Sequence, residues 1–180
     1  MAKNERQLSK APQPPAILGD TPGLSIHELT AKARSMKRKY STELIIADYI
    51  QLMSGAGEQG RQLQIENISR GLKALAVNLN VPVIALSQFS RPPKGSENHR
   101  PVLSDLRDSV ALEQDANLIL FIHDPNKSRK REHLKTLNIP LDSVDVDEFR
   151  EIIIAANRQG PTWDILVKWQ DQYFSFGEVQ

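Results

Sequence analysis

Three polar side chains directly follow apolar runs in this 180-residue sequence, and their types and positions could support chemistry. Asp48 ends the run LIIA, Gln88 comes after VPVIALS, and Arg158 follows EIIIAAN. In open α/β sheets, ligands bind beyond the carboxyl ends of the strands. There a carboxylate could hold Mg²⁺, an amide could hydrogen-bond a phosphate or an attacking water, and an arginine could stabilise charge on a transferring phosphoryl group.

Each of these residues also has an ordinary structural interpretation. An aspartate at a strand end can cap the next turn, and a Ser-Gln pair is a common entry into a polar loop. A surface arginine usually forms a salt bridge that contributes little to stability. The three residues taken one at a time therefore leave both interpretations open.

The elements that must position these residues predict an α/β sheet. Short apolar runs predict buried strands at 44–47, 81–86, 117–122 and 151–157, and an alternating pattern from 163 to 176 predicts an antiparallel hairpin. Ser25 and Glu28 have the spacing of a capping box that opens a helix reaching Tyr40. Apolar residues spaced three and four apart predict a second helix over 64–79, and 103–116 is predicted to be a helix or helical loop.

The first predicted helix has two different faces. Its buried stripe is expected to contain Ile26, Leu29, Ala33, Met36 and Tyr40. The opposite face is basic, with Lys32, Arg34, Lys37, Arg38 and Lys39. Such a face is either a binding patch or simply a solvated surface, and on its own it favours the solvated surface.

Composition predicts one soluble, cytoplasmic domain with two polar segments. Residues 1–16 are polar and proline-containing, which predicts a flexible arm before a domain spanning 17–180. The charged stretch 124–149 is expected to be an exposed insertion. The sequence has no cysteine, no apolar run of about 18 residues and a net charge of +1, so we expect no disulfide, no membrane span and no overall basic field.

Several functional motifs are absent from these residues. The sequence contains neither G-x-x-x-x-G-K-[ST] nor G-x-G-x-x-G, so it carries no phosphate-cradling P-loop. Its four histidines have no close metal-ligand spacing, which argues against zinc. The acidic group Asp142, Asp145 and Asp147 lacks the glycine and final glutamate of a calcium-binding EF-hand loop.

Five longer blocks occur in order along the chain: GDTPGLSIHELTAKARSMKRKY, LIIADYIQLM, ISRGLKALAVNLNVPVIALSQFSR, RPVLSDLRDSVALEQDANLILFI and EIIIAANRQGPTW. Together they resemble the later part of the C-terminal, RecA-like motor domain of the DnaB family of replicative DNA helicases. The resemblance implies a mostly parallel sheet flanked by helices, with a C-terminal antiparallel hairpin, incomplete at its N-terminal side. It also implies a homohexameric ring that uses ATP with Mg²⁺ to translocate along single-stranded DNA and separate strands.

The resemblance assigns roles to particular residues. Asp48 matches the Walker B aspartate that helps to hold Mg²⁺, and Gln88 matches the glutamine that senses the γ-phosphate. Arg158 matches the arginine finger that reaches into a neighbouring subunit. The DNA-contacting loop is matched by Arg107, Asp108 and Ser109. The implied partners are single-stranded DNA, further copies or an upstream helicase fragment, and a helicase loader or primase.

The sequence also departs from the family pattern. The P-loop and the acidic residue that activates water lie upstream of the matched region in the family. Ala156 replaces a usual lysine, Val110 a usual glycine and Trp163 a usual small residue. The leading hypothesis is a helicase motor segment that is inactive without the P-loop segment. The alternative is a non-catalytic RecA-like module that binds DNA or assists helicase assembly, and Ala156 favours this second hypothesis.

Overall fold

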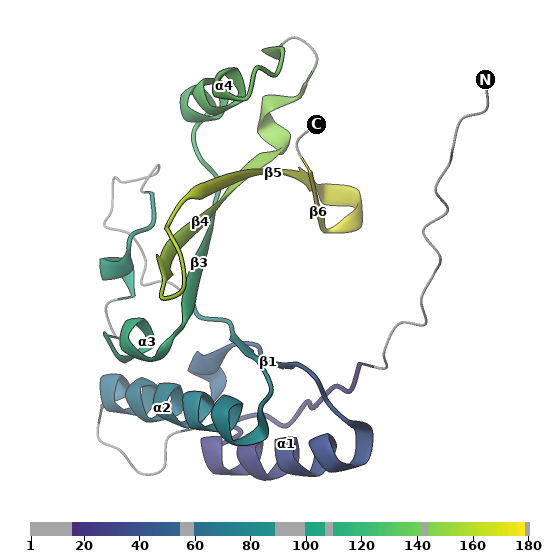
Figure 1. Ribbon diagram of the computed structural model, residues 1–180, viewed down its shortest axis with the longest axis vertical. Coiled ribbons are helices and arrows are strands. Elements are labelled where there is room, and N and C mark those ends of the chain that lie inside the picture. The colour runs from purple at the N-terminus through teal and green to yellow at the C-terminus, as the bar shows by residue number, and fades with distance from the viewer. Residues whose placement is uncertain (1–15, 55–59, 89–99, 107–109, 142–143, 179–180) are drawn as a thin grey trace, which may run out of the picture.

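The computed structural model describes residues 16–54, 60–88, 100–106, 110–141 and 144–178 (Figure 1). Nearly all of the predicted arm, residues 1–16, lies outside these ranges, as does the predicted DNA-contacting triplet Arg107, Asp108 and Ser109. No helix in the described ranges is both long and apolar enough to cross a bilayer.

The described chain folds into helices and strands in an α/β order. The four α-helices are α1 (Ile26–Tyr40), α2 (Arg61–Leu79), α3 (Val110–Asp115) and α4 (Lys127–Thr136). The six strands are β1 (Ile45–Ala47), β2 (Val83–Ala85), β3 (Leu118–His123), β4 (Phe149–Asn157), β5 (Asp164–Gln170) and β6 (Ser175–Gly177). Short 3₁₀ turns include η1 (Ile50–Leu52) and η2 (Leu103–Asp105).

The strands form two sheets of opposite character. β1 and β2 pair in parallel, with Ile46 opposite Ile84, because α2 carries the chain back between them. β3, β4, β5 and β6 form an antiparallel sheet in that order. The α/β class and the C-terminal antiparallel hairpin are thus confirmed, and parallel pairing between the described strands is confined to β1 and β2.

The helix ends follow the predicted signals. The Ser25 hydroxyl accepts a hydrogen bond from the Glu28 N–H at 3.3 Å, and the Glu28 carboxylate accepts one from the Ser25 N–H at 2.9 Å, so the capping box is confirmed. This arrangement lowers the pKa of Glu28. α2 starts three residues earlier than predicted and ends at Asn80, whose φ of 48° is left-handed.

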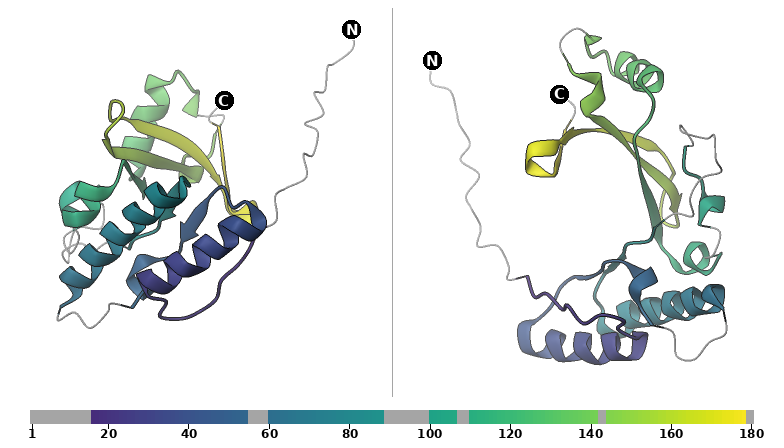
Figure 2. Two further views of the ribbon diagram at one scale, coloured as in Figure 1. Left: turned by 60° about the horizontal axis from the view of Figure 1, so that its bottom comes forward. Right: turned by 180° about the vertical axis from the view of Figure 1, so that it is seen from behind.

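The first core lies between the parallel strands and the helices α1 and α2. Its buried members are Ile50, Met53, Ile65, Ile68 and Leu72, with Ile26, Leu29, Ala47 and Val83 packed against them. α1 lies alongside α2 in both views (Figures 1 and 2). Gly71 permits this close approach, because a Cβ there would collide with the Ile26 side chain. Tyr40, predicted in the buried stripe, is half exposed at the last turn of α1.

The predicted burial of the apolar strands on both faces is wrong for β1, β2 and β3. Ile46 is 59% exposed and Ile84 is 49% exposed, although Ala47 and Val83 pack into the core. Along β3, Leu118, Leu120 and Ile122 are similarly exposed. For β1 and β2 the reason is that the core packs on one face of the parallel pair, through Ala47 and Val83, and Ile46 and Ile84 lie on the other face.

A second core lies under the charged segment 124–149. Leu134 of α4 is fully buried against Phe149 and Leu166, with Ile139, Leu141, Val144 and Val146 around them. Lys130 of the same helix is also buried. The expected exposed insertion therefore has a buried side, and α4 is packed onto the antiparallel sheet.

Candidate functional site

Asp48 and Gln88 lie at the same edge of the parallel strand pair, since each follows the carboxyl end of its strand. The Leu86 N–H donates to the Ala47 carbonyl at 2.9 Å, and the Ile50 N–H donates to the Leu86 carbonyl at 3.0 Å. These bonds continue the pairing past the last ladder residues and hold the two strand ends together. The peptide bond between Asp48 and Tyr49 is cis.

Gln51 joins the segments that carry the two predicted site residues. Its Nε2 donates to the Ser87 hydroxyl at 2.7 Å and to the Gln88 carbonyl at 3.3 Å. Its Oε1 accepts from the Gln88 N–H at 3.3 Å. The sequence analysis missed this residue. The one available signal was an amide between apolar neighbours, three residues after Asp48.

Side chains in the first turn of α2 hold the backbone around Gln51 in place. The Arg61 guanidinium donates to the Gln51 carbonyl at 2.6 Å and to the Gln64 side chain at 3.0 Å. Gln64 in turn donates to the Met53 carbonyl at 3.0 Å. The side chains of Arg61 and Gln64 thus tie the η1 segment to α2.

The Asp48 carboxylate is exposed, and within the described ranges it has no hydrogen-bond or ion-pair partner. Gln88 is also exposed, and its backbone, rather than its side-chain amide, takes part in the Gln51 bridge. Both side chains are therefore available to a ligand. A free carboxylate is a suitable oxygen donor for a hard cation such as Mg²⁺.

Arg158 belongs to the other sheet, in the turn between β4 and β5. Its N–H donates to the Asn117 carbonyl at 3.0 Å, and its guanidinium donates to the Gln114 carbonyl at the end of α3. No hydrogen bond or ion pair among the described residues joins Arg158 to Asp48 or Gln88. The structure thus brings two of the three predicted residues together and holds the third against α3.

The predicted DNA-contacting triplet at 107–109 lies outside the described residues, but the segments on either side are fixed. On one side, the Val102 N–H donates to the Asp105 carboxylate at 2.8 Å within η2. On the other, the buried Ser69 hydroxyl of α2 donates to the Asp115 carboxylate of α3 at 2.7 Å. The segment after the predicted loop is therefore anchored to α2, and the segment before it is held by a local hydrogen bond within η2.

A buried carboxylate connects this region to α4. Glu151 of β4 is fully buried, and Arg129 of α4 donates to it at 2.5 Å. The Arg100 guanidinium lies 3.5 Å from the other carboxylate oxygen, and both arginines also contact Asp164. The hydrogen bond to Glu151 raises the pKa of Arg129. Since Arg100 opens the segment leading to 107–109, Glu151 links that segment to α4.

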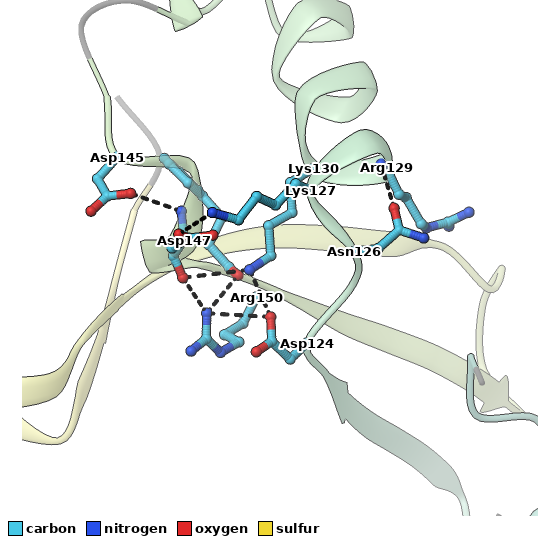
Figure 3. Close-up of polar contacts among 9 residues, drawn as sticks. Asp124, Asn126, Lys127, Arg129, Lys130, Asp145, Asp147 and Arg150 are labelled. Carbon is cyan, nitrogen blue, oxygen red and sulfur yellow. Dashed lines mark hydrogen bonds and ion pairs between the residues drawn. The ribbon is translucent and has the colours of Figure 1, made fainter. Parts of the chain in front are cut away.

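A second group of ion pairs surrounds the start of α4 (Figure 3). Lys130 pairs with Asp124 at 2.6 Å, Lys127 pairs with Asp147 at 2.6 Å, and Arg150 lies 3.5 Å from Asp124. The hydrogen bond from Lys127 lowers the pKa of Asp147. These contacts fasten α4 to the beginning of β4. The sequence predicts an exposed insertion here, because the Lys127–Asp147 and Arg150–Asp124 pairs join residues that are at least 20 positions apart.

A parallel strand pair that ends in an exposed carboxylate and an amide, backed by helices and followed by an antiparallel sheet, is typical of a RecA-like α/β domain. Solved structures agree with this class. The chain superposes on one solved ATPase domain with a TM-score of 0.71 and 34% identity, covering 88% of this chain and 52% of that one. A DnaB-like replicative helicase, from a study of its interactions with primase, gives a TM-score of 0.74 at 34% identity, covering 90% and 36%.

Sequence comparison is more specific. The replicative DNA helicase DnaB of Rickettsia typhi is 38% identical over 176 residues, covering 91% of this chain and 34% of the relative. DnaB of Mycobacterium leprae is 36% identical over 170 residues, covering 92% and 26%. The family profile described as DnaB-like helicase C terminal domain matches residues 1–178, and the chain belongs to that family. It spans about a third or less of the length of these curated relatives.

Proposed function

We propose that this chain is the later part of a replicative DNA helicase motor, which hydrolyses ATP to translocate on single-stranded DNA and unwind duplexes as a hexamer. The observation that supports the proposal is that Asp48 and Gln88 follow the carboxyl ends of two paired parallel strands, with Gln51 hydrogen-bonded to the segment of Gln88. A carboxylate next to an amide is the arrangement needed to hold a metal-bound nucleotide and to respond to its terminal phosphate.

The described residues fit part of an ATP·Mg²⁺ site. The free, exposed Asp48 carboxylate would hold Mg²⁺, and the exposed Gln88 amide would contact the γ-phosphate. The bound metal would neutralise charge on the phosphates. The backbone cradle for those phosphates has no counterpart in these residues, because the sequence lacks a P-loop. Asp48 and Gln88 therefore supply only one side of the nucleotide site.

We propose that a P-loop segment outside these residues completes the site and the sheet. β2 and β3 each have one edge without a strand partner among the described strands. Ile46 of β1, Ile84 of β2 and Leu120 of β3 expose about half of their surface. Exposed apolar side chains on neighbouring strands are typical of a surface that another polypeptide covers. An added strand with its own helices would bury them.

Arg158 is proposed to act on the nucleotide of a neighbouring subunit. Its contacts with Asn117 and Gln114, and the lack of a bond to Asp48 or Gln88 among the described residues, support a role in trans, since a finger arginine need not approach the site of its own chain. Arg107, Asp108 and Ser109 are proposed to follow the phosphate backbone of single-stranded DNA. These contacts would be independent of sequence and sensitive to salt. Primase and a helicase loader are proposed as partners of the assembled ring.

A second function, a non-catalytic module for DNA binding or helicase assembly, is favoured by Ala156. The family usually has a lysine there, two residues before the finger arginine, so one cation of the trans site is missing. This module would use the same fold and the same DNA loop. It differs from the motor because Asp48, Gln88 and Arg158 would then take no part in turnover.

ATP hydrolysis tests the two functions directly. The chain would be assayed with and without single-stranded DNA, alone and mixed with a polypeptide carrying the upstream P-loop half of the domain. The motor predicts no turnover alone and DNA-stimulated turnover in the mixture, lost in both Asp48→Ala and Arg158→Ala. If the folded mixture does not hydrolyse ATP, the motor function is overturned and the binding-module function remains. Turnover by the chain alone would overturn the proposed need for an added P-loop.

A further inference from the structure

Two helices of this chain have the same charge composition but different surroundings. α1 and α4 each contain five lysines and arginines and one glutamate. In α4, three of the five cations are paired with carboxylates: Lys127 with Asp147, Lys130 with Asp124, and Arg129 with Glu151 and Asp164. Most cations of α4 are therefore paired with carboxylates outside the helix, and Figure 3 shows those near its start.

The cations of α1 have no such partners. Among the described residues, no ion pair involves a lysine or arginine of α1, and Glu28 is engaged in the capping box. Lys32 donates to the Thr21 hydroxyl, Lys37 donates to the Thr42 carbonyl, and Lys39 lies over the Tyr40 ring. Arg34 and Arg38 are exposed, and neither guanidinium forms a hydrogen bond or ion pair with another described residue. The outer face of α1 is thus a basic surface without internal compensation.

This surface carries an electrostatic cost that a bound anion would relieve. Arg34 and Arg38 are four residues apart, so they lie one above the other on the helix, about 6 Å apart along its axis. Like charges at this spacing destabilise a helix. Cations in the last turn of α1 are stabilised by the helix dipole, but Arg34 lies in the middle of the helix, where the dipole does not stabilise a cation. Guanidinium groups are suited to phosphate, which they bind through paired hydrogen bonds.

We propose that the outer face of α1, centred on Arg34 and Arg38, binds the phosphate backbone of single-stranded DNA. The proposal rests on the proposed DNA function and adds a second contact surface to the loop at 107–109. The chain as a whole carries a charge of only +1, so a local surface must supply the attraction. α2 lies between α1 and α3 (Figure 1), so the outer face of α1 lies on the far side of α2 from α3.

The test compares two double variants that remove equal charge from the two basic helices. Arg34→Gln with Arg38→Gln alters α1, and Arg131→Gln with Lys135→Gln alters α4 at two exposed residues that are also four positions apart. Arg107→Gln tests the loop separately. Binding of the full chain to fluorescent oligothymidylate would be measured by anisotropy over a range of salt, with polyglutamate as a competitor. Circular dichroism checks that each variant is folded.

The proposal expects the α1 variant to bind oligothymidylate at least about fivefold more weakly, and its log–log salt slope to fall by about 1.4, or about 0.7 for each lost phosphate contact. The α4 variant should change little. Equal weakening by both variants would overturn the proposal, because only net charge would matter. If polyglutamate displaces the fluorescent oligothymidylate as well as unlabelled oligothymidylate does, the proposal is also overturned, and an acidic protein partner is indicated.

The loop variant separates this inference from the proposed function. Weakening by Arg107→Gln with an unchanged α1 variant would overturn the α1 surface and leave the DNA function intact. Weakening by the α1 variant alone would support the surface and remove the loop assignment. If neither variant affects binding, both proposals fail. Tighter binding of the α1 surface to duplex than to single-stranded oligonucleotide would overturn the assignment to single strands.

Discussion

The two sheets of this molecule are stabilised in different ways. The parallel pair β1–β2 is covered on one face by α1 and α2, and the residues at its end are tied by neutral hydrogen bonds from Gln51. The antiparallel sheet is covered by α4, which is fastened through the buried Glu151 and a core around Leu134. The Asp48 carboxylate, which has no partner among the described residues, lies with Gln88 at the end of the parallel pair, whereas Arg158 belongs to the antiparallel sheet. The densest ion pairing lies where α4 is held.

Removing the central carboxylate of the antiparallel half should have the largest effect on stability. Glu151→Gln keeps the shape of the side chain but leaves Arg129 and Arg100 without their buried partner. Breaking a buried pair costs about 3–5 kcal/mol, and we expect about 2–3 kcal/mol because both guanidiniums keep some solvent contact. Urea unfolding measures the change.

Glu148→Gln is the matched control for this substitution. Its pair with Lys168 is about 40% exposed on both sides and should contribute less than about 1 kcal/mol. Equal losses in the two variants would show that Glu151 does not have the special position that its burial indicates. They would also remove the proposed contrast between the two sheets.

The exposed face of the parallel half should control self-association. We expect the isolated chain to associate through its exposed strands, and Ile46→Thr with Ile84→Thr to weaken association about tenfold, or about 1.4 kcal/mol. Threonine keeps the β-branched shape that suits a strand. Val77→Thr, which alters an exposed residue on α2, is the control. Analytical ultracentrifugation measures the change, and a monodisperse monomer for the unaltered chain would contradict the expectation.

The neutral bridge should contribute less than the buried carboxylate. Gln51→Ala removes the hydrogen bonds to Ser87 and Gln88 at a site open to water, so we expect a loss of about 1 kcal/mol. The amide resonance of Gln88 should shift at the same time. Gln62→Ala, on the exposed start of α2, should leave both the unfolding midpoint and this resonance unchanged.

The smallest effect concerns pH. Burial lowers the pKa of His123 from its ordinary 6.5, with Glu151 and Asp124 opposing the shift and Arg100 and Arg129 adding to it. Below pH 6.5 the unfolded chain therefore binds a proton that the folded chain does not, so stability falls as pH falls through this region and levels off below the folded pKa. His123→Gln should therefore reduce the change of the urea unfolding midpoint with pH between about pH 7.5 and 5.5.

The exposed His27 on α1 provides the control, and His27→Gln should keep the slope. The carboxyls of Asp147 and Glu28, whose pKa values are also lowered, lose their contribution at more acidic pH, below their ordinary values of 3.8 and 4.5. A flat profile for the unaltered chain would show that His123 is hydrated in the folded state.

Local signals predicted much of the fold because they depend on neighbouring residues. The Ser25–Glu28 spacing located the start of α1, and the apolar spacing ending at Asn80 located the end of α2. The continuous runs at β1, β2 and β3 located strands correctly but overstated their burial. Such a run indicates apolar surroundings on both faces, and these residues provide a cover for only one face of the parallel pair.

The part of the candidate site that depends only on strand topology was predictable from the sequence. Asp48 and Gln88 meet because both follow parallel strands, whose carboxyl ends share an edge. Gln51 and Glu151 were not predictable, because their roles depend on partners such as Gln88 and Arg100 that are about 40 and 50 positions away in the chain. A glutamate heading an apolar run was the one sign that position 151 is buried.

The absence of a side chain at Gly71 has a consequence for how this molecule can change. Ile26 occupies the space that a Cβ at position 71 would need, so this position fixes the distance between α1 and α2. The outer residues of α1 can then be exchanged freely without altering where the helix lies. A single methyl group at position 71, by contrast, would force the Ile26 side chain at the start of α1 to shift. The packing that holds the basic surface in place therefore depends on a residue of a different helix that carries no charge.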